Sequence, residues 1–377
     1  MSDTVKKLGT ELNPARSSPE ISVVIPCYNV PEEQFRSALD SVLRQTFQSF
    51  EVIVVDDGST PSNADVLQRL CGNREKITLI RTENRGVSAA RNTGVQHAHS
   101  RYTAFLDADD LLADDYLERA RQAAEETGAD FVIGGITIIR KQEDFTGTPR
   151  RDPLQYELFD PETSSRLLHY LIGPRVTLRF PGGQIGRGPW ARLVRTDLLK
   201  EILFDEELRI GEDVIWNVQV LRHSKTVCLV RESWYGYWKN PNSVMHRYDP
   251  DFINASEKTL LRLSSLLDKS DDSLYADFSY AVYSFLHDVF WIYSLRQQRT
   301  EDRDTYRKTV KRLYREAPWR ELGSLRFFKT FNGKKKLVSL FFRLHLYFDM
   351  LALKERITAK KRSRLANCPS TGGNRRA

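Results

Sequence analysis

The sequence alternates short apolar runs with amphipathic stretches of helical spacing. The runs are rich in β-branched residues and are nearly continuous in hydrophobic character, which is typical of strands buried on both faces. They cover residues 21–25, 51–55, 77–80 and 102–106. Phe35, Leu39, Val42 and Leu43 fall on one face of a helix after the first run, and a further helix is expected over 87–97. This alternation predicts an α/β fold with a parallel sheet covered by helices on both faces.

A polar loop follows each predicted strand. The loops are PCYN at 26–29, DDGS at 56–59, ENRG at 83–86 and DADD at 107–110. In open parallel sheets, ligands bind beyond the carboxyl ends of the strands. We therefore expect the four loops to form one site. The dinucleotide-binding glycine fingerprint and the phosphate-binding loop GxxxxGK[ST] do not occur after the first strand, which disfavours a dehydrogenase or an ATPase.

The DADD loop concentrates carboxylates at the end of an apolar strand. If residues 107–109 stay extended, Asp107 and Asp109 point the same way and Ala108 leaves room beside them. Two such carboxylates suit a hard divalent cation with oxygen ligands and open positions for phosphate. The alternative is that the acids precede a helix over 111–124 and interact with its dipole.

Length and composition set broad limits. A chain of 377 residues can bury a substantial core, in two domains or in one domain with an appended module. The four cysteines form no CxxC pair, so neither a zinc site nor a disulfide framework is indicated, and a reducing, cytoplasmic location fits best. We expect no signal peptide and no membrane span, because no segment offers eighteen uncharged apolar residues.

Positive charge gathers at the C-terminal end. Residues 329–377 hold 13 Lys or Arg against Asp349 and Glu355, a net +11; because the whole chain carries +7, the rest carries −4. This distribution disfavours nucleic-acid binding by the body. Apolar residues recur at helical spacing between the lysines at 334–336 and the basic residues at 360–362, at Leu337, Leu340, Phe341, Leu344, Phe348 and Leu351. They predict an amphipathic helix that lies on an anionic membrane surface or packs against the body.

Three later segments carry candidate site residues. Residues 182–188 are glycine-rich and lead to Trp190, in a short strand or turn beside the site. Residues 209–221 place Glu212 and Asp213 at the start of a helix, where acids also serve as ordinary capping residues. The aromatic segment 234–243 is expected to line a pocket, and 251–328 read as helices.

The motifs PCYN, QTFQSFEVIVVDDGS, ENRGVSAARNTG, FLDADD and GED, in this order over residues 20 to about 245, resemble the family-2 glycosyltransferases with the GT-A fold. The resemblance implies a Rossmann-like, mainly parallel sheet flanked by helices, with a C-terminal helical extension. It also implies inverting transfer of a sugar from a nucleotide diphosphate donor to a glycan or lipid-linked acceptor, in surface polysaccharide or cell-envelope synthesis, with Mg²⁺ or Mn²⁺. We divide the chain into a leader 1–19, a donor-binding half 20–140, an acceptor-binding half 141–250, a helical extension 251–330 and a basic tail 331–377.

The resemblance assigns the first loops to the donor. Pro26 shapes the first turn, and the ring of Tyr28 stacks on the base beside Asn29, unless Tyr28 packs in the core. Asp57 accepts a hydrogen bond from the base, which favours a uracil nucleotide. Donor phosphates face Arg85.

The later motifs then complete the site. Gly86 belongs to the nucleotide-sugar site, and Arg91 is a second residue that could face the donor phosphates, although Arg91 could equally tie its helix to the sheet. Asp107 and Ala108 lie near the donor ribose and the metal, with Asp109 as the direct metal ligand and Asp107 as the second.

The GED motif supplies the catalytic residues by the same resemblance. Asp213 is the general base that deprotonates the acceptor hydroxyl, and Glu212 positions the acceptor or the metal. Trp190 and Trp238 offer flat faces to an acceptor sugar, unless they are core residues. Two rival functions stay open: a sugar-phosphate nucleotidyltransferase, and a non-catalytic membrane-surface binding protein.

Overall fold

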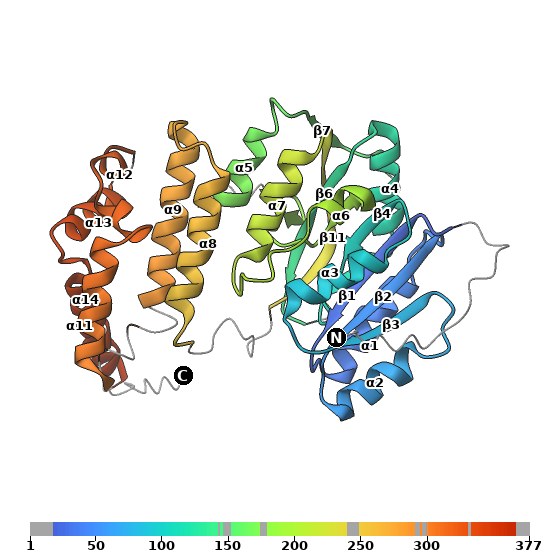
Figure 1. Ribbon diagram of the computed structural model, residues 1–377, viewed down its shortest axis with the longest axis horizontal. Coiled ribbons are helices and arrows are strands. Elements are labelled where there is room, and N and C mark those ends of the chain that lie inside the picture. The colour runs from blue at the N-terminus through green and yellow to red at the C-terminus, as the bar shows by residue number, and fades with distance from the viewer. Residues whose placement is uncertain are drawn as a thin grey trace, which may run out of the picture. The chain divides into compact units, whose positions relative to one another are not determined.

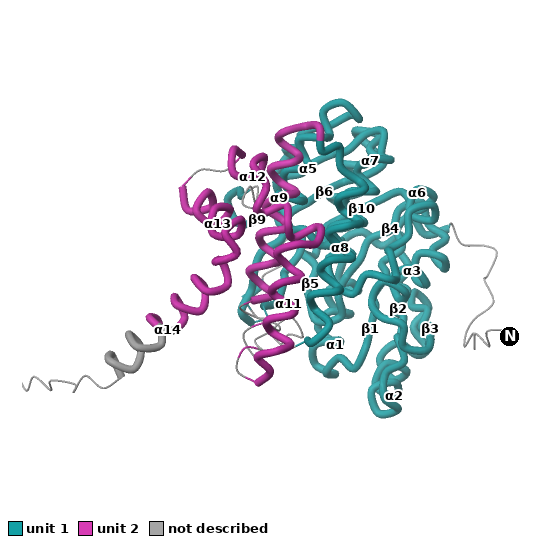
Figure 2. The backbone as a smooth tube through the Cα atoms, turned by 60° about the vertical axis from the view of Figure 1, so that its left-hand side comes forward, with its two compact units in different colours: residues 1–269 teal, residues 270–377 magenta. Residues whose placement is uncertain are grey.

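The computed structural model describes residues 18–141, 144–145, 152–173, 179–239, 249–290, 295, 299, 301–330 and 333–366. Two compact units divide the chain between Lys269 and Ser270 (Figure 2). The division falls later than the expected boundary at 250, so the first helix of the expected extension belongs to unit 1. Most of the leader lies outside the described residues.

Eleven strands form one sheet within the described part of unit 1 (Figure 1). They are β1 Ile21–Cys27, β2 Phe50–Asp57, β3 Ile77–Thr82, β4 Tyr102–Phe105, β5 Leu111–Leu112, β6 Phe131–Ile139, β7 Tyr156–Phe159, β8 Arg179–Phe180, β9 Gly183–Gln184, β10 Arg192–Arg195 and β11 Val227–Trp238. The main order is β3-β2-β1-β4-β10-β6-β11-β5. Strands β1 to β4 pair in parallel, and so do β6 and β11, whereas β10 runs antiparallel between β4 and β6. The prediction of a mainly parallel sheet is confirmed.

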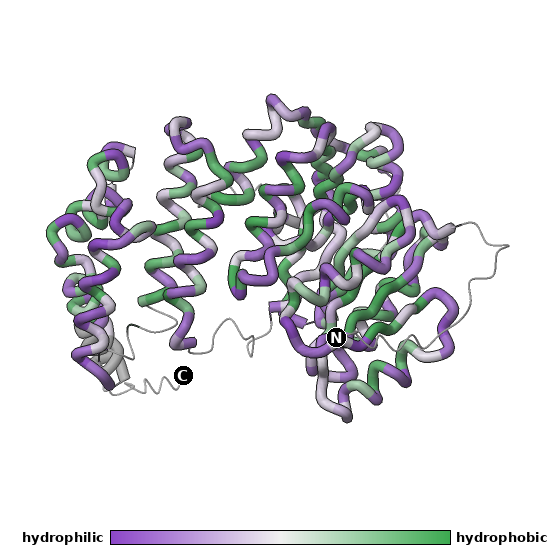
Figure 3. Tube along the Cα trace, viewed as in Figure 1, coloured by the Kyte–Doolittle hydropathy of each residue, from purple (hydrophilic) through white to green (hydrophobic). Residues whose placement is uncertain are grey.

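Helices cover both faces of this sheet. In unit 1 they are α1 Glu32–Leu43, α2 Pro61–Cys71, α3 Val87–His97, α4 Tyr116–Thr127, α5 Ser165–Ile172, α6 Thr196–Glu201, α7 Glu212–His223 and α8 Phe252–Leu266. Alternate residues of β1 point to opposite faces: Val23 belongs to the core cluster that includes residues of α1 and α4, and Val24 lies under α3. The predicted helix over 87–97 is confirmed to the residue. Figure 3 shows the apolar stretches that these strands place between the helices.

Helix α3 approaches the sheet closely because it carries Gly94. A Cβ atom at this position would lie 2.3 Å from Cγ1 of Val24, closer than two carbon atoms can approach. The absence of a side chain therefore lets α3 lie against β1 and fixes the helix whose N-terminus carries the ENRG loop.

Unit 2 is helical in its described residues. It contains α9 Asp272–Asp288, α11 Arg303–Arg315, the 3₁₀ helix η4 Trp319–Gly323, α12 Leu325–Thr330, α13 Lys334–Arg343 and α14 Tyr347–Ala366. Its core includes Trp319, which is fully buried, and Tyr314, whose ring lies 4.8 Å from Phe342 and 5.2 Å from Phe348. None of the helices in the described ranges combines the length and hydrophobicity that a bilayer-spanning segment needs.

The prediction of one continuous amphipathic helix in the tail is wrong. The chain turns between α13 and α14, where His345 takes a left-handed φ of 59° and stacks on Tyr314. Of the predicted apolar face, Phe348 and Leu351 are buried in unit 2, while Leu337, Leu340 and Leu344 stay exposed. The side chains of residues 360–366 lie outside the described residues.

We predict that Gly94→Ala destabilises the protein by about 1–3 kcal/mol, because the added methyl group must displace Val24 or push α3 away from the sheet. Chemical denaturation measures the change. Gln96→Ala, on the exposed side of the same helix, serves as the control and should change the free energy of unfolding by less than about 0.5 kcal/mol. Equal stability of Gly94→Ala and wild type would contradict the close approach.

Candidate functional site

The first three polar loops meet at one edge of the sheet and bond to one another. Strands β1 and β2 pair in parallel with Cys27 opposite Asp56, so their carboxyl ends lie side by side. The backbone N–H of Asn29 donates to Oγ of Ser59 at 3.0 Å, and Oδ1 of Asn29 accepts from the N–H of Thr60 at 2.9 Å. Asn29 takes a left-handed φ of 50° to do this, which asparagine tolerates better than most residues. Asn29 thus joins the PCYN and DDGS loops.

Asp57 joins the DDGS and ENRG loops. Its two carboxylate oxygens accept the backbone N–H groups of Arg85 at 2.9 Å and Gly86 at 2.8 Å. Gly86 precedes α3 with φ 94°, a conformation that favours glycine. Asp57 is 4% exposed, and each of its oxygens has one bond from the loop that it fixes.

Two predicted donor residues face solvent at this edge. Tyr28 is 54% exposed, so the alternative that it packs in the core is wrong. Arg85 is also exposed. Pro26 lies buried within β1, one residue before the strand ends. Tyr28 and Arg85 therefore present exposed side chains on loops that Asn29 and Asp57 hold together.

Arg91 lies beneath the surface and bonds to two acidic motifs. The residue is 3% exposed, and its Nη2 donates to Oδ1 of Asp107 at 2.9 Å while its Nη1 donates to Oε1 of Glu212 at 3.3 Å. Burial disfavours the charged guanidinium, but Asp107 and Glu212 outweigh this and raise the Arg91 pKa above its usual value. Arg91 therefore remains a cation.

Asp107 is held on both sides. Its Oδ1 faces Arg91, and its Oδ2 accepts the indole N–H of Trp190 at 2.6 Å. The Trp190 ring is tilted against Tyr237, with centroids 4.9 Å apart, and is stacked near Tyr235. Trp190 thus orients a site carboxylate, a role that the sequence did not indicate beside its predicted role in acceptor binding.

The DADD loop is a turn. Strand β4 ends at Phe105, and the N–H of Asp110 donates to the carbonyl of Asp107 at 3.1 Å, so the prediction of an extended segment is wrong. The alternative of a helix from 111 is also wrong, since β5 comes next and α4 begins at Tyr116. Ala108 is buried beneath the turn.

Asp110 anchors this turn. Its carboxylate accepts the hydroxyl of Tyr235 at 2.7 Å and the backbone N–H of Trp238 at 2.8 Å, and it is 2% exposed. Burial, aided by Asp107, raises its pKa well above the ordinary value. Trp238 is half-buried, and its own indole N–H donates to the carbonyl of Arg140 at 3.0 Å. Sequence reasoning missed Asp110 and Tyr235 as supports of the turn.

Asp109, half-buried in the same turn, is the carboxylate predicted to bind the metal directly. Burial and the nearby Asp107 raise its pKa to about 6. Among the residues that the structure describes, no group of three or more His, Cys, Asp and Glu could enclose a metal ion. Mg²⁺ is nevertheless often held by one or two carboxylates together with substrate phosphates. Asp107 and Asp109 fit that arrangement, because a cation would relieve the repulsion between them.

Glu212 and Asp213 open α7 after Gly211, as predicted. Burial and the Asp213 charge raise the pKa of Glu212, while Arg91 opposes that shift. Burial likewise raises the pKa of Asp213, against a 2.8 Å bond from the N–H of Val214 and the charge of Arg91. The guanidinium of Arg91 therefore lies between an acid of the GED motif, Glu212, and an acid of the DADD motif, Asp107.

Asn217 and Arg192 support α7 from behind and carried no signal in the sequence. Nδ2 of Asn217 donates to the carbonyls of Asp213, Arg187 and Gly188, and its Oδ1 accepts from Nε of Arg192 at 3.3 Å. Both residues are fully buried. The sequence shows Asn217 only as a polar residue in an apolar helical pattern and does not indicate what it bonds to. Its contacts with Arg192 and the backbone become visible only in the folded structure.

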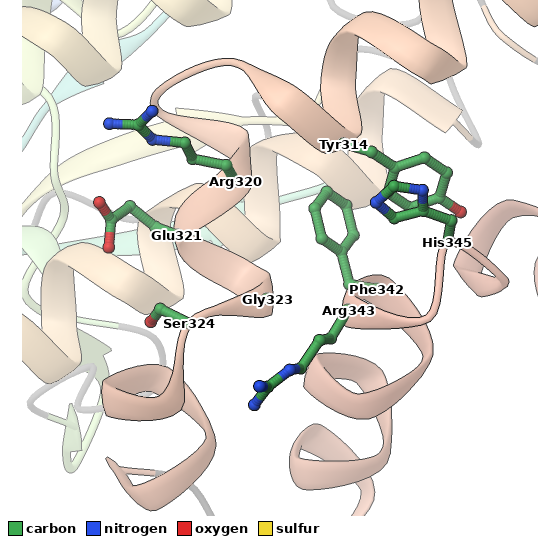
Figure 4. A pocket seen from close by; sticks show the side chains of 8 residues that line it. All are labelled: Tyr314, Arg320, Glu321, Gly323, Ser324, Phe342, Arg343 and His345. Carbon is green, nitrogen blue, oxygen red and sulfur yellow. The ribbon is translucent and has the colours of Figure 1, made fainter.

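A separate pocket lies in unit 2, between η4 and α13 (Figure 4). Tyr314, Phe342 and His345 line one side of it. It contains none of the predicted site residues.

Comparisons with known proteins agree with this architecture. Residues 22–203 match the profile described as glycosyl transferase family 2. The uncharacterized glycosyltransferase EpsJ of Bacillus subtilis (strain 168) is 31% identical over 229 residues, which cover 60% of this chain and 63% of EpsJ. The succinoglycan biosynthesis protein ExoW of Rhizobium meliloti (strain 1021) is 42% identical over 121 residues, which cover 31% of this chain and 38% of ExoW. The matched part thus spans less than two thirds of each relative.

The fold is also that of a solved structure. The crystal structure of S. aureus TarS 1-349 in complex with UDP-GlcNAc superposes with a TM-score of 0.61 at 20% identity, and the match covers 90% of this chain and 92% of that chain. The GT-A prediction is confirmed at the level of the fold.

We predict that Asp107→Asn lowers the pKa of Asp109 below about 6, because it removes the neighbouring charge. The pKa should stay above the ordinary value, since burial, the larger cause, remains. Asp109 would then become charged at lower pH than in the wild type. Carboxyl ¹³C NMR titration measures the shift, and Asp197→Asn, at an exposed helix start, is the control that should leave it unchanged. An unaltered Asp109 titration in Asp107→Asn would show that the two carboxylates do not interact.

Proposed function

We propose that this chain, whose residues 22–203 match the glycosyl transferase family 2 profile, transfers a sugar from a nucleotide diphosphate donor to a hydroxyl of a glycan or lipid-linked acceptor. One observation carries this proposal: Arg91 contacts both Asp107 and Glu212, so the donor-side and acceptor-side acids lie around one point. A transferase needs both sides in one site, because leaving group and nucleophile act on the same anomeric carbon.

The donor binds at the first loops in this proposal. The exposed ring of Tyr28 offers a stacking face for the base, and Asp57 offers its remaining acceptor positions to a base N–H group. Such an acceptor favours uracil. The TarS neighbour was solved with UDP-GlcNAc, which supports a UDP-sugar as the first donor to test. Arg85 and the N-terminus of α3 at Gly86 face the donor phosphates.

Asp109 and Asp107 would hold a divalent cation against the donor diphosphate. Such a cation offsets negative charge on the departing nucleotide. The surrounding side chains prepare this site, because Trp190 and Arg91 fix the orientation of Asp107. Asp110 fixes the turn that presents Asp109.

Asp213 acts as the general base in an inverting displacement. Its raised pKa makes it a better proton acceptor than an exposed aspartate, and the deprotonated form is the active one. The acceptor hydroxyl gives its proton to Asp213 as its oxygen attacks the anomeric carbon from the face opposite the nucleotide. The nucleoside diphosphate then leaves with the bonding electrons. Glu212, held by Arg91, positions the acceptor beside Trp190 and Trp238.

The names of relatives support a class of acceptor. ExoW is named for succinoglycan biosynthesis, and we propose a related role in surface polysaccharide or cell-envelope glycan synthesis. A donor panel with Mn²⁺ tests the function: release of nucleoside diphosphate supports it, release of pyrophosphate would support a nucleotidyltransferase, and no release would support a binding protein.

We predict that Asp213→Asn lowers turnover by roughly 10²–10⁴-fold, because the acceptor hydroxyl loses its proton acceptor. Donor affinity should change little, since the first loops are untouched. Steady-state transfer and calorimetric donor binding measure the two effects. The matched control is Asp197→Asn, which removes an exposed acid at the start of α6. Wild-type turnover by Asp213→Asn would reject the assignment.

We also propose that unit 2 docks on an anionic membrane surface. Exposed Leu337, Leu340 and Leu344 lie in the same segment as the lysines at 334–336. Exposed apolar side chains next to lysines suit the headgroup region of an anionic bilayer. This partner would keep a cytoplasmic enzyme close to a lipid-linked acceptor.

We predict that replacing Leu337, Leu340 and Leu344 together by Ser weakens binding to vesicles of anionic phospholipid at least about tenfold, because three exposed apolar contacts are lost. Vesicle co-sedimentation measures binding. Leu261→Ser, an equally exposed leucine of unit 1, is the control and should bind as the wild type does. Unchanged binding by the triple variant would remove the membrane proposal.

A further inference from the structure

Two buried arginines of unit 1 are paired with acids in different ways. Arg119 gives both Nε and Nη2 to the single carboxylate of Glu232, and its Nη1 donates to the carbonyl of Asp152 at 2.8 Å. That arrangement satisfies the guanidinium with one acid in bidentate geometry, the strongest form of this pair. Arg119 behaves as a structural ion pair.

Arg91 does not form a bidentate pair with a single acid. Its two terminal nitrogens separate, one to Asp107 after β4 and one to Glu212 at the start of α7, and these acids are 105 positions apart in the chain. Its Nε is buried without a hydrogen-bond partner among the described residues. An unpartnered buried N–H costs stability. Unlike Arg119, Arg91 therefore connects two segments that each carry an acid of the candidate site.

We propose that Arg91 is a positioning residue that holds the donor-side Asp107 and the acceptor-side Glu212 at a fixed separation, so that metal, donor and general base meet in register. The inference rests on the proposed glycosyl transfer. Asp213 follows Glu212 at the start of α7 and lies close enough to interact electrostatically with the positive charge of Arg91. The face of Phe204, 5.2 Å from the guanidinium carbon, limits movement of the side chain.

The geometry of the guanidinium makes this role specific to arginine. Its planar fork directs two N–H groups along different lines, whereas a lysine ammonium is a single point charge. Lysine at 91 would keep the positive charge but would reach one acid at the expense of the other. A role that needs only charge tolerates Arg91→Lys; a role that needs two fixed contacts does not.

The first experiment measures transfer by the full-length protein in Arg91→Lys and Arg91→Met, with Arg119→Lys as the matched buried-arginine control. We expect Arg91→Lys to lower kcat by roughly 10²-fold, a larger factor than the accompanying rise in donor KM, because a misplaced catalytic group costs about that much. Arg91→Met should lose more. Arg119→Lys should lower the unfolding temperature while keeping kcat near that of the wild type. A kcat for Arg91→Lys equal to that of wild type, or reduced no more than in Arg119→Lys, would overturn the proposal.

The second experiment needs no substrate. A double-mutant cycle compares the thermal unfolding of Arg91→Met, Glu212→Gln and the double variant. We expect the shift in the double variant to be smaller than the sum of the single shifts, since either substitution already breaks the contact. Additive shifts would show that the link is absent and would overturn the proposal. A wild-type protein that turns over no nucleotide sugar would overturn the proposed function instead, and the cycle would still decide whether Arg91 couples the two motifs.

Discussion

The site depends on a concentration of negative charge at the end of a buried strand. Asp107, Asp109 and Asp110 follow the end of β4 within five positions, and α7 adds two more acids nearby. Carboxylates that share a partly buried region repel one another and lose hydration, so each needs a donor or a cation. The fold meets this need differently at each acid. Asp110 takes neutral donors from β11, Asp107 takes Arg91 and Trp190, and Asp109 keeps a raised pKa of about 6.

This division of partners explains why the acids have different roles. Asp110 is fully buried and bonded, so it fixes the turn and stays out of the chemistry. Both carboxylate oxygens of Asp107 accept hydrogen bonds, one from Arg91 and one from Trp190, and these bonds fix its orientation. Asp109 is destabilised in its charged form by burial and by Asp107, and this is the condition under which binding a cation gains most. One short sequence, DADD, thus yields an anchor, a fixed carboxylate and the carboxylate that we propose as a cation ligand.

Much of this arrangement follows from sequence, and the failures have identifiable causes. The strand-loop pattern placed the loops at one sheet edge, because parallel strands must end there, and the helix over 87–97 agrees with α3 in both bounds. The shape of DADD could not be predicted, because the turn is held by Tyr235 from a strand more than a hundred residues away. The tail pattern is helical throughout, but the stacking of His345 on Tyr314 and the burial of Phe348 are tertiary contacts that break it. Periodicity reports which residues are apolar, and tertiary packing decides which of them are covered.

The buried arginines extend this reasoning to the acceptor side. Arg192 is fully buried and donates to the carbonyls of Gly186 and Gly134 and to Asn217, with no acid within hydrogen-bond distance among the described residues. Burial lowers its pKa to about 10, so it remains charged at neutral pH. Five N–H donors directed at carbonyls can hold the glycine-rich loop and, through Asn217, the start of α7 without using a carboxylate. Arg91 donates to carboxylates and so connects two acids, Asp107 and Glu212. Arg192 donates mainly to backbone carbonyls and so connects segments of the main chain. Arg192 therefore supports the start of α7 without engaging any of the acids that the structure describes.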